Sequence, residues 1–318
     1  PPLVNDFGYL AETEAAEQVL RRCYELPEVT DYYAGLLIDQ LYCPWEVTST
    51  VPINDEITTE EHIKAWKRQD ERTSSEPTGL SFNHYKAASQ DPTLAAFDAS
   101  LRNIPYVNGF APEIWKNITD VEILKKAAIY DVELMRTIQL MNTYFNMNNM
   151  FLARMVTTQV EVNNLLSRTQ YGGRKNHMAI DAGLILVLFF DYSRQLRLAV
   201  IAIPEDASQC YDRMNHAPTS LALRSTGIPA EPVHSMFKVL QQAAHHVSTA
   251  FGVSTETYGG QDRIDEGELA AAGVGQGNCA GPITYTNLAD KSDKVMEARG
   301  AGAIIVAPLS RQTFCLPC

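Results

Sequence analysis

Apolar residues recur every three to four positions through much of the first 110 residues, a spacing that is typical of amphipathic helices. The residues Thr58 to Glu61 resemble a helix N-terminus with a threonine cap and an acidic first turn. Pro105 is expected to end the last helix of this region, and the polar segment 74–85 is predicted to be a loop. The pattern predicts helices over 11–26, 30–42, 58–73 and 91–105.

The pattern changes after residue 110. DVEIL and VELMRTIQLM alternate apolar and polar side chains, which predicts two strands joined by a turn that carries Lys125 and Lys126. The apolar segment LRLAVIAIP, residues 196–204, is predicted to be another strand. Helices are expected over 111–117, 143–167, 179–195, 217–229, 230–250 and 284–298, with two short strands within 301–315. Helices interleaved with a few strands predict an α/β or α+β fold.

The segment EDASQCYDRMNH, residues 205–216, follows the predicted strand and precedes a predicted helix. Asp206 would therefore stand at the end of a strand, where a carboxylate can hold Mg²⁺ while water and phosphate fill the remaining positions. Asp212 is expected to orient the turn or to pair with His216. The spacing alone equally allows a structural role, with Asp206 as a helix cap and Tyr211 as a core aromatic residue.

A second candidate is the glycine-rich segment GVGQGNCAGP, residues 273–282. Its glycines would let the backbone approach another polymer closely, and Gln276 offers both a donor and an acceptor. The dinucleotide pattern G-x-G-x-x-G fails because Asn278 and Ala280 stand where glycine is needed. Five basic residues near the predicted hairpin could neutralise a triphosphate, although such residues more often solvate a surface, and that is the expectation for any one of them taken singly: Lys125, Lys126, Arg136, Arg174 and Lys175.

Charge is distributed unevenly along the 318 residues. The net charge is −12, of which residues 1–61 carry −11, so the remainder is nearly neutral. A strongly basic footprint is missing, which weakens the case for tight nucleic-acid binding by this chain alone. Because the six cysteines are scattered, we expect reduced thiols and an intracellular location, with nucleus and cytoplasm both open.

Membrane and processing segments are not predicted. The longest apolar run, residues 182–190, is too short to cross a bilayer and is expected to be a buried helix. The chain begins at Pro1 without an initiator methionine, so we expect it to be a piece of a longer product.

Four segments occur in an order that resembles a reverse transcriptase of the non-LTR retrotransposon type. They are similar to the R-P-I-S-L, Q-x-G-F-R-K, motif A and motif B segments of that family, and the resemblance covers roughly residues 111–318. Residues 1–110 resemble the helical region upstream of such domains. The four segments are MRTIQLM (135–141), QYGGRK (170–175), DASQCYDRMNH (206–216) and QGNCAGP (276–282).

The resemblance implies a right-hand polymerase arrangement with a helical extension at 1–110, fingers at 111–195 and a partial palm at 196–318. The family reaction is two-metal deoxynucleotidyl transfer with an RNA template, a DNA primer and deoxynucleoside triphosphates. Its site residues would share one cleft. Asp206 and the Ala207 carbonyl would hold Mg²⁺, Tyr211 would exclude a 2′-hydroxyl, Lys125 or Lys126 with Arg136 would grip the triphosphate, and Gln276 with Gly277 would seat the nucleotide and template base.

The chain departs from the family at three places. Thr137 replaces the proline of R-P-I, Gly281 replaces the serine of S-P, and no aromatic-x-Asp-Asp segment is present. One carboxylate is a poor site for two Mg²⁺ ions, so we expect negligible polymerase activity. The alternative is a non-catalytic remnant that binds RNA or protein, with the acidic N-terminus as the surface for a protein partner.

Overall fold

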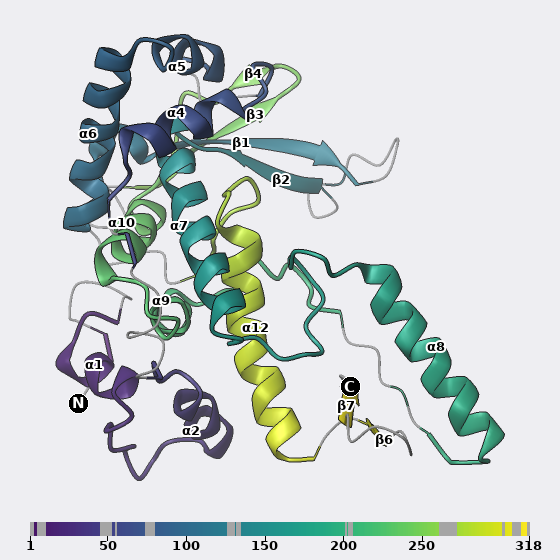
Figure 1. Cartoon of the computed structure of the whole chain (residues 1–318). Helices are drawn as coiled ribbons and strands as arrows, with labels where there is room; N and C mark the ends of the chain where they lie inside the picture. Colours follow the sequence, from purple (N-terminus) through teal and green to yellow (C-terminus); the bar gives the residue numbers. More distant parts are fainter. Residues whose placement is uncertain are drawn as a thin grey trace.

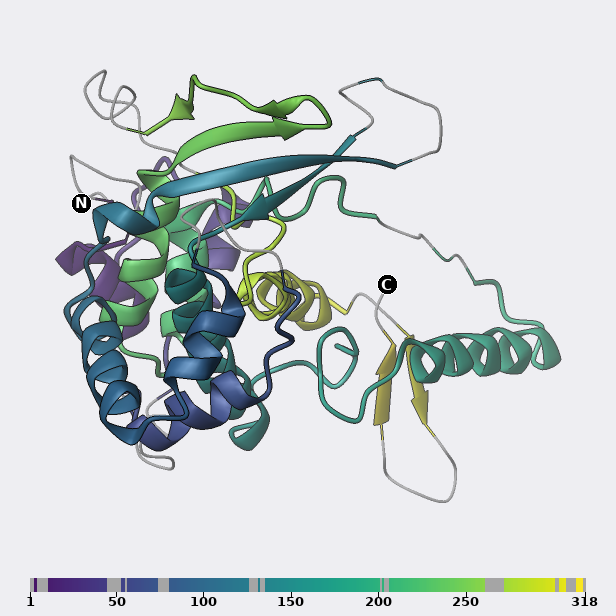
Figure 2. The same ribbon diagram turned by 90° about the horizontal axis from the view of Figure 1, so that it is seen from above.

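A mixed five-stranded sheet lies beside a set of helices (Figures 1 and 2). The computed structural model describes residues 3–4, 11–44, 53–54, 56–73, 80–125, 131, 135–200, 202, 206–260, 272–300, 303–306 and 313–316. The strands are β1 (Asn117–Leu124), β2 (Met135–Leu140), β3 (Ala244–Thr249), β4 (Gly252–Val253) and β5 (Tyr258–Gly259). Their order is β2-β1-β3-β4, and β5 pairs with β3. The expectation of mixed helix and sheet is confirmed.

The hairpin predicted after residue 110 is present. β1 pairs with β2 in antiparallel register from Thr119 opposite Leu140 to Leu124 opposite Met135. β1 also pairs in parallel with β3, which places Asp120 opposite Val247. The prediction of a helix through residue 250 was wrong, because the helix ends at Gln241 and residues 244–249 form β3.

The N-terminal region is helical, as predicted, with two corrections. Thr58 and Glu61 form the expected capping box, and Asp91 caps the last helix through the backbone N–H groups of Thr93 and Leu94. That helix does not end at Pro105: it continues to Asn108 and stops where Gly109 adopts a φ of +66°. Part of the predicted loop 74–85 is helical instead. The helices are α1 (Glu14–Leu20), α2 (Tyr32–Asp39), α4 (Thr59–Lys67), α5 (Phe82–Ala88) and α6 (Pro92–Asn108).

The later helices agree with the predicted segments, apart from the end of α10. α7 and α12 lie side by side beneath the hairpin (Figure 1). The elements are the 3₁₀ helix η1 (Glu113–Trp115), the helices α7 (Thr143–Val162), α8 (Ala179–Gln195), α9 (His216–Arg224), α10 (Ala230–Gln241) and α12 (Gly281–Ala298), and the predicted strand pair β6 (Ala303–Val306) and β7 (Thr313–Leu316).

One hydrophobic core joins the N-terminal helices to the sheet and the later helices. Trp66 from α4 belongs to the same buried cluster as Trp115, Phe145, Phe237 and Val274. A second, smaller cluster packs α1 and α2 against α9. Burial of these large side chains is the main favourable term that holds the segments together. The domain boundaries at 110 and 195 remain predictions.

The apolar helix α8 is present, but the prediction that it is buried was wrong. Leu184, Val187 and Leu188 are 56%, 63% and 58% exposed. α8 extends away from the other helices in both views (Figures 1 and 2). In the part of the chain that the structure describes, no helix has the length and apolar character needed to span a membrane.

Candidate nucleotide-binding site

The glycine-rich segment lies between the start of α9 and the end of β2. The backbone N–H groups of Gly273 and Val274 donate to the carbonyl oxygens of Met214 and Tyr211, each at 3.0 Å. On the other side, the N–H of Gln139 in β2 donates to the carbonyl of Gln276 at 2.7 Å. Three segments that are far apart in the sequence are therefore bonded to one another.

Asn146 at the start of α7 fixes the next turn of this segment. Its side-chain amide donates to the Gly277 carbonyl at 2.9 Å, and its side-chain oxygen accepts from the N–H of Cys279 at 2.8 Å. Gln276 is half-buried and Gly277 is exposed. Both predicted nucleotide-contacting residues are thus held firmly beside β2, with the Gly277 side open to solvent.

Two glycines in this segment are required by packing within the chain. Gly275 has a φ of +71° and Gly277 a φ of +138°, conformations that side chains rarely adopt. A Cβ atom at Gly275 would overlap the side chains of Gln139 and Met141, and one at Gly277 would overlap the Gln139 carbonyl. The close approach expected of these glycines therefore occurs, but the polymer that they approach is β2 of the same chain.

Tyr211 contacts the start of α12. Its ring meets that of Tyr285 edge to face, with 6.1 Å between centroids, and a Cβ atom at Gly281 would lie 3.4 Å from the Tyr211 ring. Burial raises the pKa of the Tyr211 phenol, so it is neutral at physiological pH. The ring is half-buried and partly free to meet a ligand, which suits both a sugar contact and a packing role.

The predicted strand before Asp206 is not formed among the described residues of that segment. Residues 198–200 and 202 adopt no strand conformation, and both Asp206 and Ala207 are exposed. The prediction of a strand over 196–204 is therefore wrong for residues 196–200 and 202, while residues 203–205, directly before Asp206, lie outside the described part of the chain. The carboxylate lies close enough to Tyr285 to help raise its pKa, although burial is the larger cause.

The residues around Asp206 do not fit two Mg²⁺ ions. Within the described residues, no group of three His, Cys, Asp or Glu side chains could hold a metal ion. A carboxylate pair on rigid elements is what a two-metal site needs, and Asp206 supplies one exposed carboxylate on a turn. No catalytic step can be assigned to metal at this position.

Of the hairpin cations, Lys125 has a described electrostatic effect on the turn 206–216. Lys125 directly follows β1, and its charge reaches Asp212: burial and the charge of Asp120 raise the pKa of the Asp212 carboxyl, while Lys125 opposes the rise. Arg136 is exposed near the start of β2, opposite Ile123. Lys126 lies outside the described residues. The structure thus brings Lys125 to the turn 206–216, and Arg136 stands further along the same hairpin.

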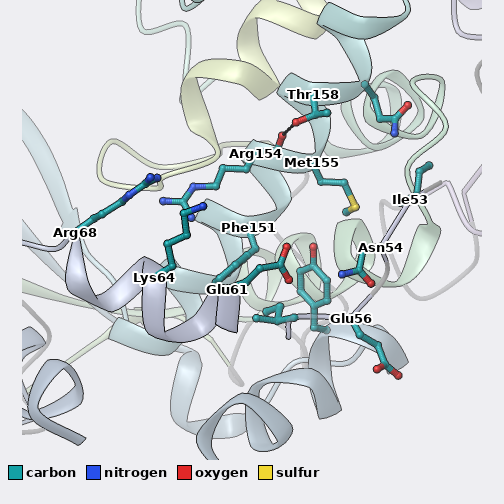
Figure 3. Close-up of a pocket in the computed structure, with 13 residues that line it drawn as sticks. Ile53, Asn54, Glu56, Glu61, Lys64, Arg68, Phe151, Arg154, Met155 and Thr158 are labelled. Carbon is teal, nitrogen blue, oxygen red and sulfur yellow. Dashed lines mark hydrogen bonds between the residues drawn. The ribbon is translucent and has the colours of Figure 1, made fainter. Parts of the chain in front are cut away.

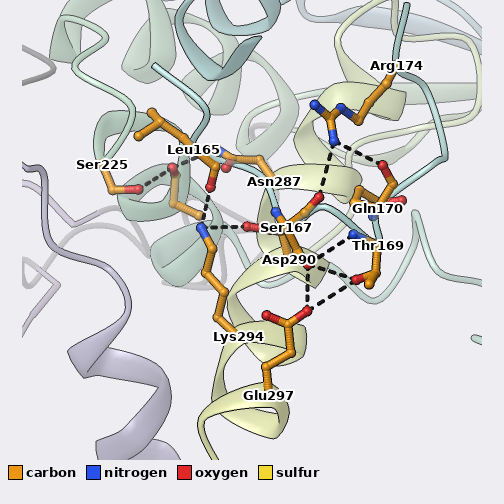
Figure 4. Close-up of polar contacts among 11 residues, drawn as sticks. Leu165, Ser167, Thr169, Gln170, Arg174, Ser225, Asn287, Asp290, Lys294 and Glu297 are labelled. Carbon is orange, nitrogen blue, oxygen red and sulfur yellow. Dashed lines mark hydrogen bonds and ion pairs between the residues drawn. The ribbon is translucent and has the colours of Figure 1, made fainter. Parts of the chain in front are cut away.

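Arg174 is not available to a triphosphate. Its guanidinium forms two hydrogen bonds of 2.9 Å with the Glu161 carboxylate and also donates to the carbonyl oxygens of Ser167 and Gln170. Figure 4 shows how this turn is tied to α12, where Asp290 accepts from the N–H of Ser167. Within QYGGRK, Arg174 therefore stabilises the fold, whereas the Lys175 side chain is exposed.

A buried polar cluster beside the site was not predicted. The Asp120 carboxylate is fully buried in the sheet, 3.1 Å from Nδ1 of His245, and accepts a hydrogen bond from the Tyr258 hydroxyl. The rings of His245 and Tyr258 stack with centroids 4.9 Å apart. Burial, then the bond to Asp120, raises the pKa of Tyr258. The sequence shows only an aspartate within a predicted strand, because its two partners come from strands 125 and 138 residues later in the chain.

Comparison with known proteins adds no relative: no protein-family model and no curated protein matches this chain.

Proposed function

We propose that this chain is the fingers and motif A to motif B portion of a reverse transcriptase-like protein of the non-LTR type, which binds an RNA template and a DNA primer without extending the primer. The observation that carries the proposal is the bonding of three separate segments that resemble family motifs. Gln139 of β2, Tyr211 of the turn and Val274 to Gly277 of the glycine segment form one hydrogen-bonded unit.

In this proposal the exposed cations of the hairpin would contact the phosphates, and the turn with the glycine segment would meet the sugar and base. Lys125 and Arg136 are both exposed. Tyr211 and Gln276 are half-buried in the bonded unit. Phosphate contacts of this kind supply affinity that falls with salt, while the half-buried groups would set the position of the nucleotide.

The proposal includes the absence of synthesis. The family reaction depends on Mg²⁺ held by carboxylates from two motifs, and this chain offers Asp206 alone with no consecutive aspartates anywhere in its sequence. A second function, a non-catalytic RNA- or protein-binding scaffold, is favoured by one observation: Asp206 is exposed and follows no described strand.

Fluorescence anisotropy with a labelled RNA–DNA template–primer at about 50 mM salt tests the proposal. We expect binding that weakens with salt, and we expect Lys125→Gln with Arg136→Gln to reduce the slope of log affinity against log salt by about one per lost phosphate contact. The matched control is Lys67→Gln with Arg72→Gln, which removes two exposed charges elsewhere. Equal binding by both double variants would contradict the proposal.

Primer extension tests the absence of synthesis, and the preference for a template–primer separates the two functions. With Mg²⁺ or Mn²⁺ and all four deoxynucleotides, we expect no product above the protein-free reaction. Synthesis that is lost in Asp206→Ala would show that the chain assembles a working metal site. Binding to single-stranded RNA or to a protein, without preference for a template–primer, would favour the scaffold.

A further inference from the structure

A pocket with a volume of about 370 Å³ lies between α4, α7 and residues 53, 54, 56 and 57 (Figure 3). It belongs to no predicted site. Its size is at the lower end of the range of small-molecule sites in proteins. Figure 3 shows Lys64, Arg68 and Arg154 gathered at one end of the pocket, with Glu56 at the other.

The three cations have no carboxylate partner. Among the residues that the structure describes, no Asp or Glu forms an ion pair with Lys64, Arg68 or Arg154. The Glu61 carboxylate also lines the pocket, accepts from the N–H and hydroxyl of Thr58 through one oxygen, and its charge acts on Arg154. This end of the pocket therefore carries three cations and one carboxylate, a net positive charge.

Burial and the charge of Arg68 disfavour the charged form of Arg154, and a bound anion would stabilise that charge. Its guanidinium contacts the Met150 sulfur at 3.3 Å and stands 5.7 Å from the centre of the Phe151 ring. Partial burial, followed by the charge of Arg68, lowers the pKa of Arg154. Two neighbouring guanidinium groups are a typical arrangement for a bound phosphate, whose oxygens can bridge both.

The remaining wall of the pocket is partly apolar. Ile57, Tyr106 and Phe151 are buried at its wall, and Asn54 presents an exposed amide at the rim. Asn103 fixes this wall by bonding both the N–H and the carbonyl of Ile57, at 2.8 and 2.9 Å. The combination of a cationic end, an apolar wall and one amide matches the phosphate, ring and polar edge of a nucleotide.

The helices around the pocket are held by a buried network. Arg102 of α6 donates to the Asn148 side chain in α7 at 2.8 and 3.0 Å, and its guanidinium lies 3.1 Å from Nδ1 of His62 in α4. Because all three side chains are nearly inaccessible to solvent, the spacing of α4 and α7 is fixed before any ligand binds.

We propose that this pocket binds one nucleotide, with its phosphate between Lys64, Arg68 and Arg154 and its base against Ile57, Tyr106 and Phe151. The nucleotide is either free or part of a single-stranded nucleic acid, since both present the same phosphate and base. This site goes beyond the proposed function because it uses neither the hairpin cations nor the glycine segment.

Isothermal titration with AMP, adenosine and inorganic phosphate tests the site on the full chain. AMP is expected to bind at least tenfold more tightly than either part alone, and Arg68→Gln with Arg154→Gln should weaken AMP binding at least tenfold. Lys67→Gln with Arg72→Gln is the control and should change AMP binding less than twofold. Phosphate binding as tightly as AMP, or AMP binding unchanged in the Arg68/Arg154 variant, would overturn the proposal.

A labelled eight-residue oligoadenylate distinguishes the two sources. If the nucleotide belongs to a strand, the oligomer binds more tightly than AMP and loses affinity in the Arg68/Arg154 variant; if it is free, AMP binds and the oligomer does not. Absence of binding by both would overturn the proposal. Because Lys125 and Arg136 are untouched in these variants, template–primer binding reports on the proposed function separately. Circular dichroism of each variant confirms that its helices are intact.

Discussion

Replacing Gly277 by alanine should destabilise the fold through a defined backbone clash. The φ of +138° at this residue belongs to a region that is almost restricted to glycine, and the added Cβ would overlap the Gln139 carbonyl, which is backbone and cannot move alone. The strained conformation costs about 1–3 kcal/mol. Displacing β2 would weaken the bond from Gln139 to Gln276, worth about 1 kcal/mol. We therefore expect a loss of about 2–4 kcal/mol.

Gly183→Ala provides the matched control with the opposite sign. Gly183 lies within α8, it is exposed, and no atom would stand within 4 Å of its added Cβ. Alanine at such a position favours the helix, so the free energy of unfolding should rise by about 0.5–1 kcal/mol.

Urea unfolding followed by circular dichroism at 222 nm measures both variants against the parent chain. The reasoning predicts a lower midpoint for Gly277→Ala and an equal or higher midpoint for Gly183→Ala, with unchanged slopes. A Gly277→Ala variant as stable as the parent would refute the close approach of the glycine segment to β2. The hydrogen-bonded unit behind the proposed function would then be lost as well.

Three further predictions concern buried charges. Asp120→Ala should lower the free energy of unfolding by about 2–4 kcal/mol, because it leaves His245 and Tyr258 without their shared acceptor; urea unfolding that changes by less than 1 kcal/mol would contradict this. Burial lowers the pKa of His234 to about 4; the charges of Glu12 and Glu231 oppose this shift, and those of Arg224 and Lys238 add to it. The neutral imidazole should therefore contribute its full stability above pH 6.5, and this contribution should be lost as the pH falls towards 4. The difference in stability between the parent and His234→Gln across pH 4 to 7 measures this, and a constant difference would refute it. Burial likewise lowers the pKa of Lys291 to about 8, so Lys291→Met should stabilise the chain most below pH 8, and a thermal melt at pH 7 that shows no gain would count against it.

The sequence pattern correctly predicted the elements that are stabilised by bonds between residues close in the sequence. Thr58 was recognisable as a helix cap because a cap bonds within three residues of itself. The β1–β2 hairpin followed from alternation in two neighbouring segments. In contrast, residues 244–249 form a strand because β1, more than 120 residues earlier, offers a free edge, and no periodicity within 230–250 reveals that partner.

The errors at residues 196–200 and at α8 have the same origin. An apolar segment such as 196–204 has strand propensity, but a strand exists only when a neighbour pairs with it, and residues 198–200 have no strand partner. The apolar run 182–190 similarly predicts burial without stating what covers it, and Leu184 and Val187 remain exposed. At the site, the sequence predicted Tyr211, Gln276 and Gly277 as neighbours, whereas the Asp120 cluster depends on pairing of distant strands.

The central claim is that the turn at Tyr211 and the glycine segment form one surface that meets the end of a primer. Photocrosslinking from a 4-thiothymidine at the primer 3′ end, followed by mass spectrometry of the labelled peptides, tests it most directly. The account predicts crosslinks within residues 206–216 and 273–282. Crosslinks confined to other segments, such as α8 or the N-terminal helices, would contradict it.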